Sequence, residues 1–121
     1  MRTSSEEKYL EEIYKAVNQR GYARVSDVAQ SLDVSVSSVS KMVRKLAGYQ
    51  LVEHERYQYI KMTEKGILVG KQLVLKHQIL ATFFQMIGLE KEEVEEEVNK
   101  IEHYISWSTI GKIHDFILRN E

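Results

Sequence analysis

The stretch from residue 23 to residue 52 constrains the fold of this 121-residue chain more than any other segment. Its apolar spacing predicts one helix that begins with Ser26 as its N-cap and a second helix over residues 36–47, joined by a turn at 33–35. Two short helices around a tight turn are typical of a helix-turn-helix, which places its second helix in the major groove of DNA.

The outer face of the second predicted helix is polar and basic. Small hydroxyl side chains allow close approach to base edges, and basic side chains suit phosphates. The residues that we expect to contact DNA from this segment are Ser35, Ser37, Ser38, Lys41, Arg44 and Lys45. An ordinary solvent-facing helix has a similar composition. The segment that follows distinguishes such a helix from one that contacts DNA.

Residues 51–62 predict two short β segments on either side of the tip at 56–58, because Tyr and Ile favour strands. Arg56 and Tyr57 at this tip suit contacts with the DNA backbone or minor groove. Thr63 then begins a new helix. Helix, turn, helix and β hairpin in this order indicate a winged helix-turn-helix.

The rest of the chain has helical periodicity. We expect helices over residues 5–19, 64–87 and 91–105, and a last helix that follows a turn at 106–108 and ends near Leu118. We expect another backbone to pass close to Gly66 and Gly70. The predicted fold is mostly α, with a winged helix-turn-helix DNA-binding domain at 1–62 and a helical metal-binding and dimerisation domain at 63–121.

Composition excludes several classes of protein. The chain has no cysteine, so it has no disulfide or thiolate metal ligand, and it has neither a long apolar run nor an apolar leader. We therefore expect a cytoplasmic protein without a membrane partner. The net charge is −1, but residues 15–65 carry +4 and residues 90–102 carry −5. The basic half suits a nucleic acid.

Many large apolar residues lie in the last part of the chain: Val94, Val98, Ile101, Ile105, Trp107, Ile110, Ile113, Phe116 and Ile117. These residues form either an internal core or a subunit interface. We favour a homodimer interface, because a recognition helix generally acts in pairs on a two-fold operator.

Some polar residues indicate a metal site. His77 lies on the apolar stripe of its predicted helix, where a structural histidine is the simpler interpretation. Asn99, Glu102 and His103 have the spacing of one helical face, and Glu11 is a further candidate. Carboxylates and imidazoles without thiolates suit manganese, iron or zinc.

These motifs together resemble the diphtheria-toxin-repressor family of metal-dependent repressors, and within it the manganese-responsive members. The resemblance covers nearly the whole chain and is carried by residues 7–9, 21–27, 37–43, His77, and 101–103 with 106–107. It implies a homodimer that binds a divalent metal, Mn²⁺, and double-stranded operator DNA to repress metal-uptake genes. Glu11, His77, Glu102 and His103 match ligand positions of the family.

Two positions depart from the family pattern. Lys8 and Asn99 stand where the resemblance implies carboxylate ligands, so the site has less negative charge than two divalent cations require. We therefore expect at most one metal, or independence from metal with the Lys8 ammonium paired to Glu11 or Glu102. Alternatively, Lys8 points to solvent and pairs with Glu12.

Two other functions compete with this interpretation. A small metallohydrolase would use His77, Glu102 and His103, but the chain has no H-E-x-x-H, nucleophile or phosphate-loop motif, so we expect no enzyme and no catalytic residue. The alternative is a winged-helix module that binds only proteins and has no metal response.

Overall fold

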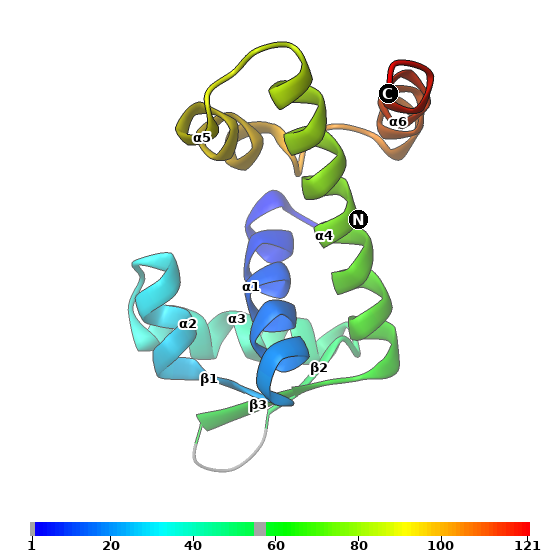
Figure 1. The fold of residues 1–121 in the computed structure, drawn as a ribbon. Helices are drawn as coiled ribbons and strands as arrows, with labels where there is room; N and C mark the ends of the chain where they lie inside the picture. Colours follow the sequence, from blue (N-terminus) through cyan, green and yellow to red (C-terminus); the bar gives the residue numbers. More distant parts are fainter. Residues whose placement is uncertain (1, 55–57) are drawn as a thin grey trace. The chain divides into compact units, whose positions relative to one another are not determined.

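A computed structural model describes residues 2–54 and 58–121 (Figure 1). The chain divides into two compact units, Met1–Gln72 and Leu73–Glu121. No helix among the described residues has the length and apolar character needed to cross a membrane. The elements are α1 (Ser4–Arg20), β1 (Ala23–Arg24), α2 (Val25–Leu32), α3 (Val36–Gly48), β2 (Val52–His54), β3 (Tyr59–Met62), α4 (Glu64–Met86), α5 (Lys91–Ile101) and α6 (Trp107–Arg119).

The first unit contains the predicted helix-turn-helix and wing, which confirms that part of the fold. The helices α2 and α3 pack on α1, and β2 pairs with β3 in an antiparallel hairpin. The short strand β1 extends this sheet to the order β1-β3-β2, and the sequence did not predict it. Arg56 and Tyr57, at the predicted wing tip, lie outside the described residues.

The helix α1 begins and ends at well-formed caps. The Thr3 hydroxyl accepts the N–H of Glu6 at 3.1 Å, and the Glu6 carboxylate accepts the N–H of Thr3 at 2.8 Å. Gly21 ends the helix with φ 89°, a left-handed conformation that glycine adopts without strain. Between the caps, the buried stripe of Tyr9, Leu10 and Ile13 faces the core of the unit.

The start of α4 belongs to the first unit. The Thr63 hydroxyl accepts the N–H of Gly66 at 3.0 Å, so Thr63 caps α4 as predicted. A Cβ at Gly66 would collide with the Leu51 carbonyl, and one at Gly70 would collide with the Tyr14 side chain. These close approaches place the first turns of α4 against the winged helix, and the two compact units divide within α4, after Gln72. The predicted domain boundary at 62–63 stays a prediction.

The second unit consists of the remainder of α4 with α5 and α6. Its core is formed by Ile79, Leu80, Val94, Val98, Ile110 and Ile117. The sequence left open whether nine apolar residues of this part of the chain form a core or a subunit interface. Four of them, Val94, Val98, Ile110 and Ile117, belong to the internal core. Trp107 and Phe116 instead expose 46% and 41% of their surface.

Two local predictions were wrong. Ser26 lies inside α2, whose N-cap is Arg24, because the chain leaves β1 directly into the helix. The helix α5 ends at Ile101 rather than Ile105, and residues 102–104 form a turn in which Tyr104 N–H donates to the Ile101 carbonyl at 2.9 Å. Ser106 is the extended N-cap of α6, which requires the chain to leave the helical conformation before it.

Candidate metal centre and nucleic-acid interface

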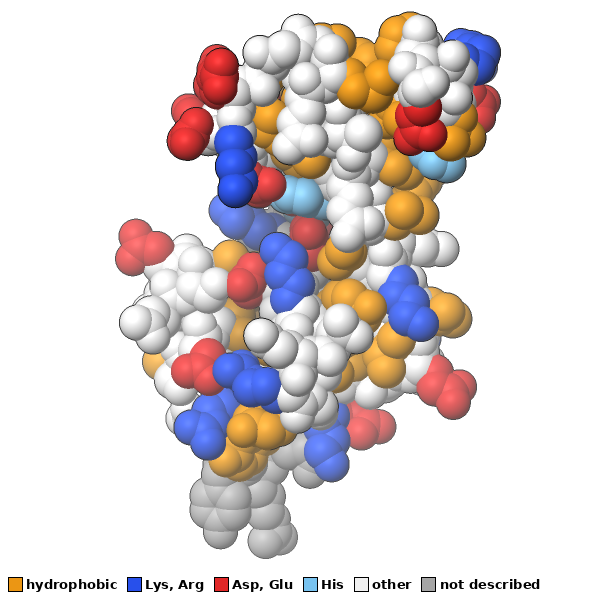
Figure 2. Space-filling view, viewed as in Figure 1, with side chains coloured by type: hydrophobic (Ala, Val, Ile, Leu, Met, Phe, Trp, Pro, Cys, Tyr) orange, Lys and Arg blue, Asp and Glu red, His pale blue; other side chains and the backbone are white. Residues whose placement is uncertain are grey.

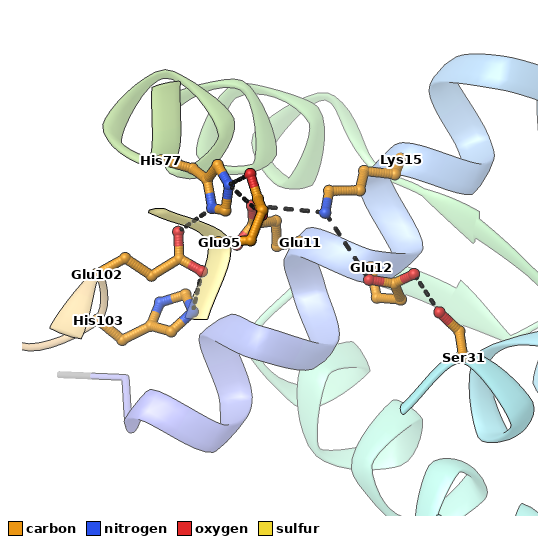
Figure 3. Close-up of polar contacts among 8 residues, drawn as sticks. All are labelled: Glu11, Glu12, Lys15, Ser31, His77, Glu95, Glu102 and His103. Atoms are coloured by element: carbon orange, nitrogen blue, oxygen red, sulfur yellow. Dashed lines mark hydrogen bonds and ion pairs between the residues drawn. The ribbon is translucent and has the colours of Figure 1, made fainter. Parts of the chain in front are cut away.

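His77, on α4 in the second unit, contacts a carboxylate with each nitrogen of its ring (Figure 3). Nδ1 lies 2.9 Å from Oε2 of Glu102, and Nε2 lies 3.2 Å from Oε2 of Glu95. The hydrogen bond with Glu102, followed by the charges of Glu102 and Glu95, raises the pKa of His77 above its ordinary value in spite of its partial burial.

Glu102 and His103 lie in the turn after α5. Nε2 of His103 is 3.3 Å from Oε1 of Glu102, and both side chains are only 6% exposed. Burial opposes ionisation of Glu102, but the interactions with His103 and His77 outweigh it and lower the pKa of Glu102 to about 2. Glu102 is therefore an ionised carboxylate held between two imidazoles.

This donor set fits a divalent transition metal. It offers imidazole nitrogens and carboxylate oxygens, the ligand types that suit manganese, iron and zinc. Two ligand atoms bound at about 2.1 Å and at right angles on one metal are separated by roughly 3 Å. The 2.9 Å between Nδ1 of His77 and Oε2 of Glu102 agrees with that separation.

Other residues of the predicted metal site are placed differently. Asn99 is exposed on α5. Glu102, the C-cap of α5, keeps helical backbone and donates its N–H to the Val98 carbonyl at 2.9 Å, whereas His103 follows in the turn. Glu11 belongs to the first unit, where Oε2 is 3.9 Å from Nζ of Lys15. Lys8 is exposed, and the described residues include no ion pair between it and Glu11 or Glu12.

Glu95 was not among the residues predicted for the metal site. Acidic side chains do gather over α5 (Figure 2). Glu95, however, contacts His77, although its side chain is 60% exposed. The available signal was its position one helical turn before Asn99, on the same face of α5.

The exposed face of α3 is the candidate nucleic-acid interface. Ser37, Ser38, Lys41 and Arg44 are exposed there, as predicted for a recognition helix. Ser35 has a structural role in addition, because its hydroxyl accepts the N–H of Ser38 at 3.0 Å and caps α3.

Lys45 points toward α1. Its Nζ lies 3.5 Å from Oε2 of Glu6, and the Tyr49 hydroxyl donates to the same oxygen at 3.1 Å. The hydrogen bond from the Thr3 N–H, with those of Tyr49 and Lys45, lowers the pKa of Glu6. These contacts join the capped end of α1 to the recognition helix within one unit.

A second basic group at the sheet was not predicted. Arg24 donates to the Tyr59 hydroxyl at 3.2 Å, and its guanidinium lies 5.3 Å from the centre of the Tyr59 ring. Arg20 and Arg24 both lie over the Tyr22 ring, at 5.7 and 6.0 Å. The alternation of basic and aromatic residues over 20–24 was the signal that could have revealed this group.

Comparison with known families gives two adjacent matches. Residues 1–60 match the model described as "Iron dependent repressor, N-terminal DNA binding domain". Residues 63–120 match "Iron dependent repressor, metal binding and dimerisation domain".

Similar proteins agree with these matches. The HTH-type transcriptional regulators MntR of Bacillus subtilis and Shouchella clausii are 43% and 44% identical over 117 residues, which cover 97% of this chain and 82% of each relative. Among solved structures, T. acidophilum IdeR has a TM-score of 0.80 at 28% identity, and the manganese regulator SloR has 0.80 at 27%. These alignments cover 95% and 93% of this chain, which spans about half the length of those two proteins, 55% and 53%.

Proposed function

The chain belongs to the iron-dependent repressor family, and we propose that it is a manganese-responsive repressor that binds operator DNA as a homodimer. Membership makes it a DNA-binding transcriptional regulator of a metal-binding family and not an enzyme. The resemblance to the diphtheria-toxin-repressor family is thereby confirmed. The choice of manganese is supported by the MntR relatives and by a donor set without thiolates.

The observation that carries the metal response is the contact of Glu102 with both His77 and His103, at 2.9 and 3.3 Å. We assign these three residues as ligands from the second unit. Glu11 of the first unit and the amide oxygen of Asn99 are the further ligands that the resemblance implies. A bound divalent metal would supply the positive charge to which these carboxylate, amide and imidazole ligands bind.

We propose one metal per subunit. Lys8 and Asn99 replace two carboxylates of the family pattern, so a second divalent cation would be poorly neutralised. Lys8 is exposed, so its ammonium group would oppose a second divalent cation by long-range repulsion more than through a fixed ion pair. Calorimetric titration with Mn²⁺ tests this stoichiometry, and two tight sites per subunit would contradict it.

For DNA recognition we propose that two recognition helices act on successive turns of the operator. Ser37, Ser38 and Lys41 on the exposed face of α3 would contact bases or phosphates, and Arg44 would hold the backbone. We propose further contacts with the DNA backbone from Ser35, Lys45, Arg56 and Tyr57. Ser35 and Lys45 would have to serve this role in addition to the internal contacts described above.

Metal and DNA are proposed to be linked through the first unit. The helix α1 carries Glu11, and the same helix contacts α3 and its Lys45 through Glu6. A metal ligand on α1 therefore belongs to the same compact unit as the recognition helix. A metal that favours the DNA-competent geometry must raise DNA affinity.

The test is fluorescence anisotropy on a duplex that the protein selects from a random pool, with and without Mn²⁺. We expect Mn²⁺ to tighten binding to this duplex and not to a scrambled duplex. Equal affinity with and without Mn²⁺ would contradict the metal response. Failure to select any duplex would favour a module that binds only proteins.

A further inference from the structure

The imidazole of His77 lies between two carboxylates from different segments of the second unit. Glu102 in the turn after α5 faces Nδ1, and Glu95 on α5 faces Nε2 with its two oxygens at 3.2 and 3.4 Å (Figure 3). A neutral imidazole carries a proton on one nitrogen and a lone pair on the other. A histidine that binds a metal must therefore keep its proton on the nitrogen that faces away from the metal.

The two sides of the ring differ in their surroundings. On the Nδ1 side, Glu102 is 6% exposed and is also held by His103, so a second imidazole donor is close to the same carboxylate. On the Nε2 side, Glu95 is 60% exposed. The concentration of sheltered donor atoms on the Nδ1 side makes it the side suited to a metal.

We propose that Glu95 accepts the Nε2–H of His77 and so reserves Nδ1 for a divalent metal ion. Glu95 is then a positioning residue, which acts on the metal through the orientation and tautomer of His77. This inference rests on the proposed metal-responsive function and assigns a role to a residue outside the set of ligand positions that the resemblance implies.

The neighbouring acids of α5 are engaged elsewhere. Glu93 accepts the N–H of Glu90 and caps the helix, and Glu96 and Glu97 lie 3.5 and 3.7 Å from Lys100. Glu95 is one turn before Asn99 on the same face of α5. The resemblance implies a glutamate at position 99, where this chain has Asn99. The carboxylate that contacts His77 is instead Glu95, one helical turn earlier.

The first experiment is calorimetric titration of the 121-residue chain with Mn²⁺ in four forms: wild type, Glu95→Ala, Glu95→Gln and Glu96→Ala. We expect Glu95→Ala to weaken binding by about 10- to 100-fold, as for other residues that orient a ligand. Glu95→Gln should lose less, because its amide oxygen still accepts the Nε2–H. Glu96→Ala, a matched loss of one exposed acid on the same helix, should bind as wild type does.

The second experiment identifies the protonated nitrogen directly. Long-range ¹H–¹⁵N spectra of the zinc-loaded protein should show the His77 proton on Nε2 and the metal on Nδ1. In Glu95→Ala this preference should weaken. Metal on Nε2 of the wild type would overturn the proposal, because Glu95 would then lie on the metal side of the ring.

The outcomes separate this inference from the proposed function. If the wild type binds Mn²⁺ and Glu95→Ala binds it equally well, Glu95 has no positioning role while the metal response stands. If the wild type binds neither Mn²⁺ nor Zn²⁺, the metal response and the role of Glu95 are both wrong. Thermal unfolding of Glu95→Ala at the wild-type temperature would show that any loss of affinity is local.

Discussion

Glu6 in the first unit and Glu102 in the second unit are buried carboxylates whose partners are of opposite kinds. In the first unit, Glu6 is held by a backbone N–H, by Lys45 and by Tyr49, none of which is an imidazole. In the second unit, Glu102 is held by two histidines, whose charge depends on protons and on metal. The partners of Glu6 suit a rigid DNA-binding unit. The partners of Glu102 suit a unit that responds to protons and to metal.

The largest effect should come from removing the central imidazole of the second unit. His77→Ala should weaken Mn²⁺ binding by more than about 100-fold. Removing a ligand costs more affinity than removing a residue that only orients a ligand. Calorimetric titration measures this loss. His114→Ala removes an exposed histidine from α6 and should leave affinity unchanged. Equal affinities for the two variants would remove His77 from the site.

Gly66 tests the rigidity attributed to the first unit. Gly66→Ala should lower the free energy of unfolding by about 1–3 kcal/mol, because the new Cβ meets the Leu51 backbone, which cannot move aside as a flexible side chain can. Gly111 in α6 has open space around it, so Gly111→Ala should raise stability by up to about 1 kcal/mol. Urea unfolding compares the two, and equal changes would refute the close contact at Gly66.

Lys41 tests whether the exposed face of α3 meets DNA. Lys41→Ala should weaken operator binding and reduce the magnitude of its salt slope by about 1, because one phosphate contact is lost. Lys100→Ala removes an equal charge from α5 and should leave the slope as it is. Anisotropy titrations at several salt concentrations measure both, and an unchanged slope for Lys41→Ala would rule out this contact.

The smallest effect concerns pH and Glu6. Since the folded protein lowers the pKa of Glu6, its contribution is present above the ordinary value of 4.5 and is lost as pH falls through the folded value. Glu6→Gln should therefore be less stable than wild type at pH 7, and the difference should shrink on acidification below 4.5. Thermal unfolding at several pH values measures the difference. A constant difference would show that the charge of Glu6 is not involved.

The fold was largely predictable because its signals are local. The turn at 33–35 and Thr63 act through their own backbone or the next few residues, and the structure confirms both. The strand β1 was not predictable, because two residues carry no periodicity and pair only with a distant strand. The end of α5 at Ile101 was also missed, since no glycine or proline marks it and the cap of α6 decides it.

The candidate metal site was likewise predictable only in part. His77, Glu102 and His103 were identified from residue type and spacing, and the second unit brings them together. The helix predicted to carry Glu102 and His103 ends earlier than expected, because the turn at 102–104 was not foreseen. Glu95 was hidden in a run of acids, where only a tertiary contact with α4 distinguishes one glutamate from its neighbours.

Metal and DNA are proposed to favour the same state of the protein. The direct test is to measure the affinity for Mn²⁺ by calorimetry with and without saturating duplex selected by the protein. Because linkage is reciprocal, we predict that DNA tightens Mn²⁺ binding by the same factor by which Mn²⁺ tightens DNA binding. Identical Mn²⁺ affinities in the free and DNA-bound protein would contradict the account.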